Sequence, residues 1–152
     1  MCTNNICRSP TAEAVFRAAA EREGIAHLLR IGSAGTHGFH AGEPPDPRAI
    51  RAARGRGYDI ASLRARQVGA DDFIRFDRIF AMDRTNLAAL AALRPEGHAG
   101  HVGLFLDVVP DAGVRDVADP YFAGAAAFER VLDLVEPASQ ALAAQLARTL
   151  PR

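Results

Sequence analysis

The sequence predicts an α/β fold with three layers, α/β/α, around a small parallel sheet of about four strands. Helical patterns alternate with short apolar runs along the chain, and this alternation is typical of parallel strands covered by helices on both faces. The length of 152 residues suits one domain with its own core, so we expect a single domain over residues 1–152. Hydrophobic residues make up 49% of the chain, which argues against disorder.

The first helix is predicted to begin with Ser9 as N-cap and Pro10 as first helical residue. Apolar residues then recur at helical spacing, at Ala12, Val15, Phe16 and Ala19, and charged residues occupy the other side. Gly24 can end this helix, because glycine readily adopts the backbone conformation of a C-terminal cap.

The next part of the chain predicts a strand, a loop and a second helix. Leu28–Gly32 is read as a short strand. Residues 35–46 are rich in glycine and proline and predict a loop. Pro47 then begins a helix that is expected to run to Arg56 and to stop at Gly57.

The second half of the chain predicts two further strands and two further helices. The expected segments are a strand at 77–82, a helix at about 85–93, a strand at 102–106, a loop at 107–120 and a helix at 123–150. Pro137 lies inside the last of these helices. Because proline lacks the N–H group that a helix interior uses, we expect a break there.

The segment Cys2–Pro10, CTNNICRSP, carries the clearest chemical signal. Its cysteine precedes an arginine by six residues, and a helix is predicted to start directly afterwards. The N–H groups of a tight loop and the positive end of a helix together suit one tetrahedral anion. The sequence therefore predicts a phosphate-binding loop, in which the amides of residues 3–8 stabilise charge on the phosphoryl oxygens.

Cys2 is the candidate nucleophile of this loop, since a helix N-terminus and a nearby guanidinium favour a reactive thiolate. Arg8 offers a planar fork that can hold two phosphate oxygens, and Ser9 can donate a hydrogen bond to the thiolate. Attack on phosphorus would give a phosphocysteine that water then cleaves. We expect neither a metal ion nor a cofactor, because the loop itself supplies the positive field.

The leaving oxygen needs a proton donor, and Asp119 in the run Asp119-Pro120-Tyr121 is the candidate. It follows the last predicted strand, in a loop from which a carboxyl group can reach the site. The acid of the first step would serve as the base that activates water in the second. Tyr121 is a candidate wall of the substrate channel.

These residues together resemble the low-molecular-weight protein tyrosine phosphatases, and the resemblance extends over nearly the whole chain. It also includes the runs Ser33-Ala34-Gly35-Thr36, Asp46-Pro47-Arg48-Ala49, Ala65-Arg66-Gln67 and Met82-Asp83. A bare CX5R recurs by chance, whereas CX5RSP followed at a distance by DPY is specific. The resemblance implies a phosphatase domain that hydrolyses phosphotyrosine in a protein substrate.

The resemblance also implies a role for each candidate residue. Cys2 would be the nucleophile, Arg8 the phosphate ligand and Asp119 the general acid and base. The residues expected to contact the substrate are Thr3, Asn4, Asn5, Ile6, Cys7, Ser9, Phe39 and Tyr121, with Phe122 beside them. Ser33 is expected to support the loop by hydrogen bonds and Asp83 to lie below the site. Cys7 is expected to trap an oxidised Cys2 in a reversible disulfide.

The chain departs from the family pattern at three places. Relatives enter the loop from a short apolar strand, whereas Met1 alone precedes Cys2 here, so we expect a truncated central strand and a true start upstream. Asn4 replaces the commonest glycine, and asparagine is the next most tolerant of positive φ. Leu63 stands where many relatives have a histidine that bonds the loop asparagine, so we expect Asn5 to be held less firmly.

Three other functions remain open from the sequence. The chain would be a non-catalytic phosphate-binding or interaction protein if the shortened front abolished catalysis. Arsenate reductases of this fold relay a disulfide through further cysteines, and none follows Cys7. Protein arginine phosphatases of this fold place threonine where Ile6 stands, and a branched apolar side chain favours a flat aryl ring over a guanidinium phosphate.

Composition excludes several classes of partner. The formal net charge is zero, so no basic excess indicates nucleic-acid binding. No apolar run approaches the roughly 20 residues of a membrane span, and we expect no membrane partner. Two cysteines do not make a disulfide scaffold, and no signal-peptide pattern is present, so we expect a cytoplasmic protein.

Overall fold

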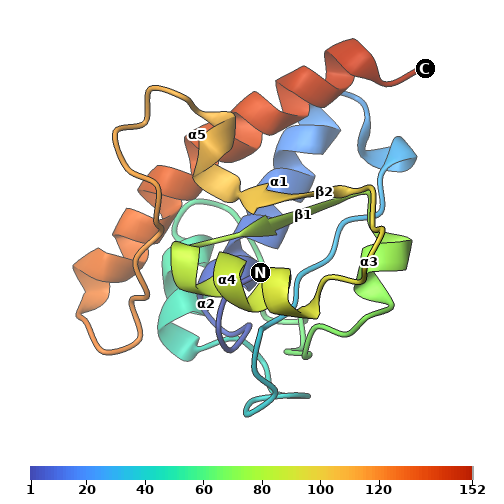
Figure 1. Cartoon of the computed structure of the whole chain (residues 1–152). Helices are drawn as coiled ribbons and strands as arrows, with labels where there is room; N and C mark the ends of the chain where they lie inside the picture. Colours follow the sequence, from blue (N-terminus) through green and yellow to red (C-terminus); the bar gives the residue numbers. More distant parts are fainter. Residues whose placement is uncertain (152) are drawn as a thin grey trace.

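The computed structural model describes residues 1–151 and has an α/β architecture (Figure 1). Its helices are α1 (Arg8–Arg22), α2 (Pro47–Arg54), α3 (Asp72–Arg75), α4 (Arg84–Leu93) and α5 (Ala125–Thr149), with short 3-10 turns η1 (Ala26–Leu28) and η2 (Phe105–Val108). The strands β1 (Arg78–Ala81) and β2 (His101–Leu104) pair in parallel, and α4 forms the crossover between them. Arg78 lies opposite His101 in this register.

Successive side chains of a strand face opposite sides of the sheet, so the side chains of β1 pack against two different layers of helices. Ile79 and Ala81 pack in one core with Phe73 of α3 and Leu90 of α4. Phe80 packs in the other core, which α1 and α5 build with η2. α1 and α5 lie against each other on that side of the sheet, and α4 covers the other side (Figure 1). The predicted three-layer α/β/α arrangement is confirmed.

The sheet is smaller than the four strands expected. Two strands form in the described residues, and further segments lie in line with them through isolated hydrogen bonds and bridges. Met1 lies beside β1, where its ammonium group donates to the Phe80 carbonyl at 2.7 Å and its own carbonyl accepts from Met82 N at 2.9 Å. Cys2 pairs with Gly35, and Gly35 with Gln67, as isolated parallel bridges. Met1 and Cys2 thus occupy the place of the expected truncated strand.

The strand predicted at Leu28–Gly32 is not formed. Ala26–Leu28 is the turn η1, and residues 29–34 have no strand pairing. Arg17 of α1 donates instead to the carbonyl of Ile31 at 3.1 Å. An apolar run becomes a strand only where another strand offers its backbone groups, and this segment does not find such a partner.

The break predicted at Pro137 is also wrong, since α5 runs through it without interruption. Val135 and Ala138, on either side of the proline, have no exposed surface, and they pack in the α1–α5 core. An interior proline costs a helix about 3 kcal/mol, and burial of the helix face on both sides of it outweighs this cost. The second helix is shorter than predicted and ends at Arg54.

Among residues 1–151, no helix combines the length and the apolar character that crossing a bilayer requires.

Candidate active site

The loop from Cys2 to Arg8 connects the edge of the sheet to the first turn of α1. Three of its carbonyl oxygens accept hydrogen bonds of 2.9 Å from N–H groups elsewhere in the chain: Cys2 from Thr36, Thr3 from His37 and Ile6 from Asp46. These bonds turn the carbonyls away from the interior of the loop. The arrangement leaves loop amides available to a bound anion.

Asn5 holds the loop in its curved shape. Its φ of 59° places it in the left-handed region, which asparagine tolerates better than most residues. Its side-chain oxygen accepts from Arg66 N at 3.0 Å, and its amide nitrogen donates to Ser9 Oγ at 2.7 Å and to Ser33 Oγ at 3.0 Å. Ser33 in turn donates to Glu13 at 2.7 Å, so the support reaches α1.

These contacts concern two of the departures from the family pattern. Positive φ falls at Asn5, so the replacement of glycine by Asn4 brings no strain of this kind. Leu63 in place of a histidine does not leave Asn5 loose, because the backbone N–H of Arg66 satisfies its carbonyl oxygen. The two donor bonds to Ser9 and the Ser33 hydroxyl hold the other end of the side chain.

Ser9 lies at the sulfur atom of the candidate nucleophile. Its Oγ is 3.0 Å from Cys2 Sγ and also lies 3.4 Å from the Ala34 carbonyl. The prediction that Ser9 caps α1 is therefore wrong: the helix begins at Arg8, and Cys7 is an N-cap without a side-chain bond. The hydroxyl group that would have capped the helix is used to orient the thiol.

Arg8 is buried, with 1% of its surface exposed, and its guanidinium group is held on several sides. Nη1 donates to Asp83 Oδ2 at 2.5 Å and to the Val117 carbonyl at 2.8 Å. Nη2 lies 3.4 Å from Thr3 Oγ1 and 3.7 Å from Asp119 Oδ2. Asp83 also accepts from Asn86 N at 2.7 Å, which fixes the carboxylate at the start of α4. A buried charge requires such pairing.

The predicted nucleophile, cation and acid share one small hollow. Its volume is about 10 Å³, and it is lined by Cys2, Asn4, Ile6, Cys7, Arg8, Asp119 and Tyr121. Asp119 comes from a segment far along the chain, and its carboxylate also accepts from Tyr121 N at 3.1 Å. The structure thus brings together residues separated by more than a hundred positions.

Phe39 does not line this hollow. Its side chain is 81% exposed and stacks on His37 with a centroid distance of 5.5 Å. Phe122 is exposed as well and meets Tyr121 edge to face at 4.9 Å. Of the predicted aromatic walls, the structure places Tyr121 at the hollow, and Phe39 stands in the loop outside it.

Both cysteines are free thiols. Burial, followed by the nearby charge of Asp46, raises the pKa of the Cys7 thiol to about 12. The raised pKa disfavours the Cys7 thiolate, which is the reactive form of a cysteine. Within residues 1–151, no group of three or more histidine, cysteine, aspartate or glutamate side chains is placed to hold a metal ion.

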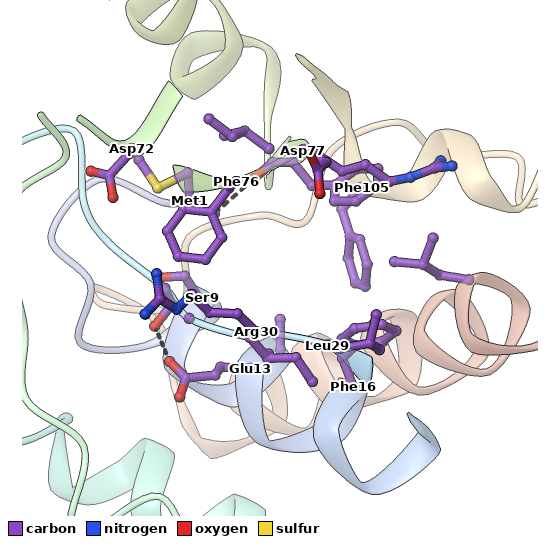
Figure 2. A pocket seen from close by; sticks show the side chains of 18 of the residues that line it. Met1, Ser9, Glu13, Phe16, Leu29, Arg30, Asp72, Phe76, Asp77 and Phe105 are labelled. Carbon is purple, nitrogen blue, oxygen red and sulfur yellow. Dashed lines mark hydrogen bonds between the residues drawn. The ribbon is translucent and has the colours of Figure 1, made fainter. Parts of the chain in front are cut away.

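A second cavity is far larger, about 420 Å³, and lies between β1, α1, α5 and residues 28–33 (Figure 2). Met1 and Phe76 line one side of it, and Phe16 and Leu29 line the other. It includes none of the predicted catalytic side chains. Size alone therefore does not identify the site of chemistry in this chain.

The structure adds Gly35 to the residues that shape the site. A Cβ atom there would lie 2.7 Å from the Thr3 carbonyl oxygen and 3.0 Å from the carbonyl carbon of Asn4. Only glycine permits the loop to approach this closely. In the sequence Gly35 is only part of a run that matches the family, and no local signal reveals its role, because the backbone it approaches lies about thirty positions away in the chain.

Comparison with known proteins assigns the chain to a family. A family model described as low molecular weight phosphotyrosine protein phosphatase matches residues 1–152. The chain belongs to this family. The low molecular weight phosphotyrosine protein phosphatases are hydrolases that act on phosphotyrosine in proteins, and the chain shares their fold and their activity.

Individual relatives cover most of the chain. A low molecular weight protein-tyrosine-phosphatase of Streptomyces coelicolor is 47% identical over 149 residues, which span 95% of this chain and 89% of the relative. A low molecular weight phosphotyrosine protein phosphatase of Schizosaccharomyces pombe is 40% identical over 84% of this chain and 82% of its own length. The crystal structure of a protein tyrosine phosphatase of Entamoeba histolytica, with Hepes in its active site, matches with a TM-score of 0.92 and 35% identity, over 97% of this chain and 94% of that one.

Proposed function

We propose that the hollow lined by Cys2, Arg8 and Asp119 is the catalytic site of this phosphatase, in one domain over residues 1–152. The observation that supports this proposal most directly is the common hollow itself, which joins a thiol, a fixed guanidinium and a carboxyl group. These three groups supply a nucleophile, a site for phosphoryl charge and a proton donor.

In the first step, the Cys2 thiolate attacks phosphorus and an S–P bond forms. The bond between phosphorus and the tyrosine oxygen breaks, and Asp119 gives its proton to that oxygen. In the second step, Asp119 takes a proton from water as the water oxygen attacks phosphorus. The S–P bond breaks, inorganic phosphate leaves and the thiolate is restored. The acid of one step is the base of the next, which balances the proton over a full turnover.

Ser9 and Arg8 assist these steps from fixed positions. The Ser9 hydroxyl, 3.0 Å from Cys2 Sγ, donates to the sulfur when it is charged and stabilises it as the leaving group of the second step. Asp83 and the Val117 carbonyl hold the Arg8 guanidinium before the substrate arrives. A cation that is already oriented needs little reorganisation as charge develops on the phosphoryl oxygens.

We propose a phosphotyrosine-containing protein as the substrate and the cytoplasm as the compartment. Ile6 and Tyr121 offer apolar surface at the rim of the hollow, which suits a flat aryl ring. The chemistry requires a reduced Cys2, and both thiols are free in the structure. A reducing compartment keeps them so.

Hydrolysis of p-nitrophenyl phosphate tests the assignment, with Cys2→Ser and Asp119→Ala as variants. We expect Cys2→Ser to abolish turnover. We expect Asp119→Ala to lower kcat about 100-fold or more, because the second step loses the base that activates water. Rapid acid quenching should trap phosphate on Cys2 during turnover of Asp119→Ala. Undiminished turnover by Cys2→Ser would refute the proposal, and faster cleavage of phosphoarginine than of phosphotyrosine would refute the substrate class.

A further inference from the structure

The segment that carries Asp119 has few attachments to the rest of the molecule. Val117 N donates to the Met82 carbonyl at 2.8 Å. Among the described residues, no backbone hydrogen bond then joins residues 118–123 to another segment, and Ala123 N bonds the Pro120 carbonyl locally. Pro120 is buried, but Asp119 is exposed. The position of the acid therefore depends on side-chain contacts: the ion pair of Asp119 with Arg8 at 3.7 Å and the contacts of its neighbours.

Arg48 of α2 makes such a contact. Its guanidinium carbon lies 5.4 Å from the centre of the Tyr121 ring and 4.8 Å from the centre of the Phe128 ring. Phe128 is buried in the first turn of α5, so its position is fixed by the core. A guanidinium group at this distance from an aromatic face is attracted to it. Arg48 thus ties the exposed side of Tyr121 to a rigid helix.

Asp46 fixes the guanidinium group in turn. Its carboxylate accepts from Arg48 Nε at 3.0 Å and from Nη2 at 2.8 Å, which is a two-bond pairing. This pairing holds the pKa of the Asp46 carboxyl below its usual range, mainly through the side-chain hydrogen bond of Arg48. The backbone N–H of Asp46 donates to the Ile6 carbonyl at 2.9 Å. One continuous set of contacts therefore joins the phosphate loop to the acid segment.

We propose that Arg48 is a positioning residue, which holds Tyr121 and through it the Asp119 carboxyl in register with the phosphate loop. This inference rests on the proposed role of Asp119. Tyr121 N bonds Asp119 Oδ1 at 3.1 Å, so a shift of Tyr121 moves the carboxylate. Arg48 itself does not line the hollow and does not touch the reacting atoms.

The dependence of the rate on the leaving group tests this role. A positioned acid keeps kcat/KM nearly constant from p-nitrophenyl phosphate, whose leaving group needs little protonation, to phenyl phosphate, whose leaving group needs it. We expect Arg48→Met to lower kcat/KM about tenfold for phenyl phosphate and about twofold or less for p-nitrophenyl phosphate. The variant Asp119→Asn has no acid, so it gives the largest difference in kcat/KM between the two substrates that loss of the acid can cause. Inhibition by inorganic phosphate should not change, since Cys2 and Arg8 remain in place.

Arg54→Met is the matched control, because Arg54 is an exposed arginine of the same helix. It should behave as the unmodified protein with both substrates. Arg48→Lys keeps the charge but loses the planar fork, so we expect a loss of kcat/KM for phenyl phosphate between those of the unmodified protein and Arg48→Met. This second variant keeps the test valid if Arg48→Met folds poorly. In the background of Tyr121→Ala, Arg48→Met should have little further effect on the ratio of the two rates.

An equal loss of rate with both substrates, or weaker inhibition by phosphate, would overturn the positioning role and indicate a general effect on the loop. Unchanged rates in Arg48→Met and Arg48→Lys would overturn it as well. If the unmodified protein hydrolysed no aryl phosphate, the proposed function would fail, and the inference with it. If the unmodified protein is active and the Arg48 variants do not show the selective loss of rate, the inference fails and the proposed function stands.

Discussion

In a protein produced so that it begins at Met1, the α-amino group of this residue provides a sharp test of the structure. Burial lowers the pKa of this group from 8.0 to about 6, with smaller contributions from neighbouring charges. The ammonium group donates to the Phe80 carbonyl at 2.7 Å at the edge of the large cavity (Figure 2). The folded protein therefore disfavours the protonated amine relative to the unfolded chain.

The sign and size of the effect follow from proton linkage. Between pH 6 and pH 8, the unfolded chain binds more protons at this amine than the folded chain does, so the free energy of unfolding rises with pH across this window. A shift of two units corresponds to about 3 kcal/mol. The full penalty is present below pH 6 and absent above pH 8.

Acetylation of the amine removes this titration. The chain contains no lysine, so Met1 carries its one amino group, and hydroxylamine reverses any acetylation of thiols. The acetylated amide can still donate to Phe80, without the buried charge. We expect the acetylated chain to be about 3 kcal/mol more stable in urea unfolding at about pH 5.5 and equally stable at about pH 8.5.

Comparison of the two forms cancels the contribution of the five histidines, which are the same in both. The same difference in stability at both pH values would contradict the reasoning. An amine that reacts with acetic anhydride in the folded protein as fast as in urea would also contradict it.

Three substitutions test other parts of the site. Gly35→Ala places a Cβ atom 2.7 Å from the Thr3 carbonyl and should displace the loop, which lowers kcat/KM about 100-fold and the stability in urea by about 1–3 kcal/mol. Asp83→Asn removes the charge paired with buried Arg8; a loss of about 1–3 kcal/mol in urea and weaker inhibition by phosphate are expected. With the pKa of Cys7 at about 12, iodoacetamide near neutral pH should modify Cys2 and spare Cys7, and Cys7→Ser should not slow this reaction. Activity equal to that of the unmodified protein would contradict the expectation for Gly35→Ala or Asp83→Asn. Labelled Cys7, found by fragmenting the peptide Met1–Arg8, would contradict the expectation for the thiols.

The sequence predicted the parts of the site that are close together along the chain. The spacing of Cys2 and Arg8 and the helix after them are local features, and the loop amides follow from them. Asp119 could be proposed because it lies in a loop after the last predicted strand, from which a carboxyl group can reach the site. The prediction that Ser9 caps the helix is wrong because a hydroxyl group near a helix start suits both a cap and a thiol, and here Ser9 Oγ lies 3.0 Å from the sulfur atom of Cys2.

The remaining parts depend on contacts that no local pattern contains. Whether residues 28–32 form a strand depends on the partner they meet, and Pro137 is tolerated because of the core on both sides of it. Phe39 was assigned to the substrate wall from its place in the family pattern, whereas its loop carries it outside the hollow. The orientation of a loop is determined by its ends and its tertiary contacts, and side chains at its tip vary with both.

The groups that hold the fold together at this site are the same groups that prepare it for chemistry. Asp83 caps α4 and pairs with Arg8, so the start of a helix sets the direction of the guanidinium group that we propose as phosphate ligand. Asn5 stabilises a left-handed turn and also bonds Ser9, whose hydroxyl lies at the sulfur. A substitution at either residue should therefore lower stability and rate together. Arg48 differs from them, because it lies outside the hollow and, besides Asp46 and Phe128, contacts Tyr121 of the acid segment, so its loss should lower the rate more than the stability.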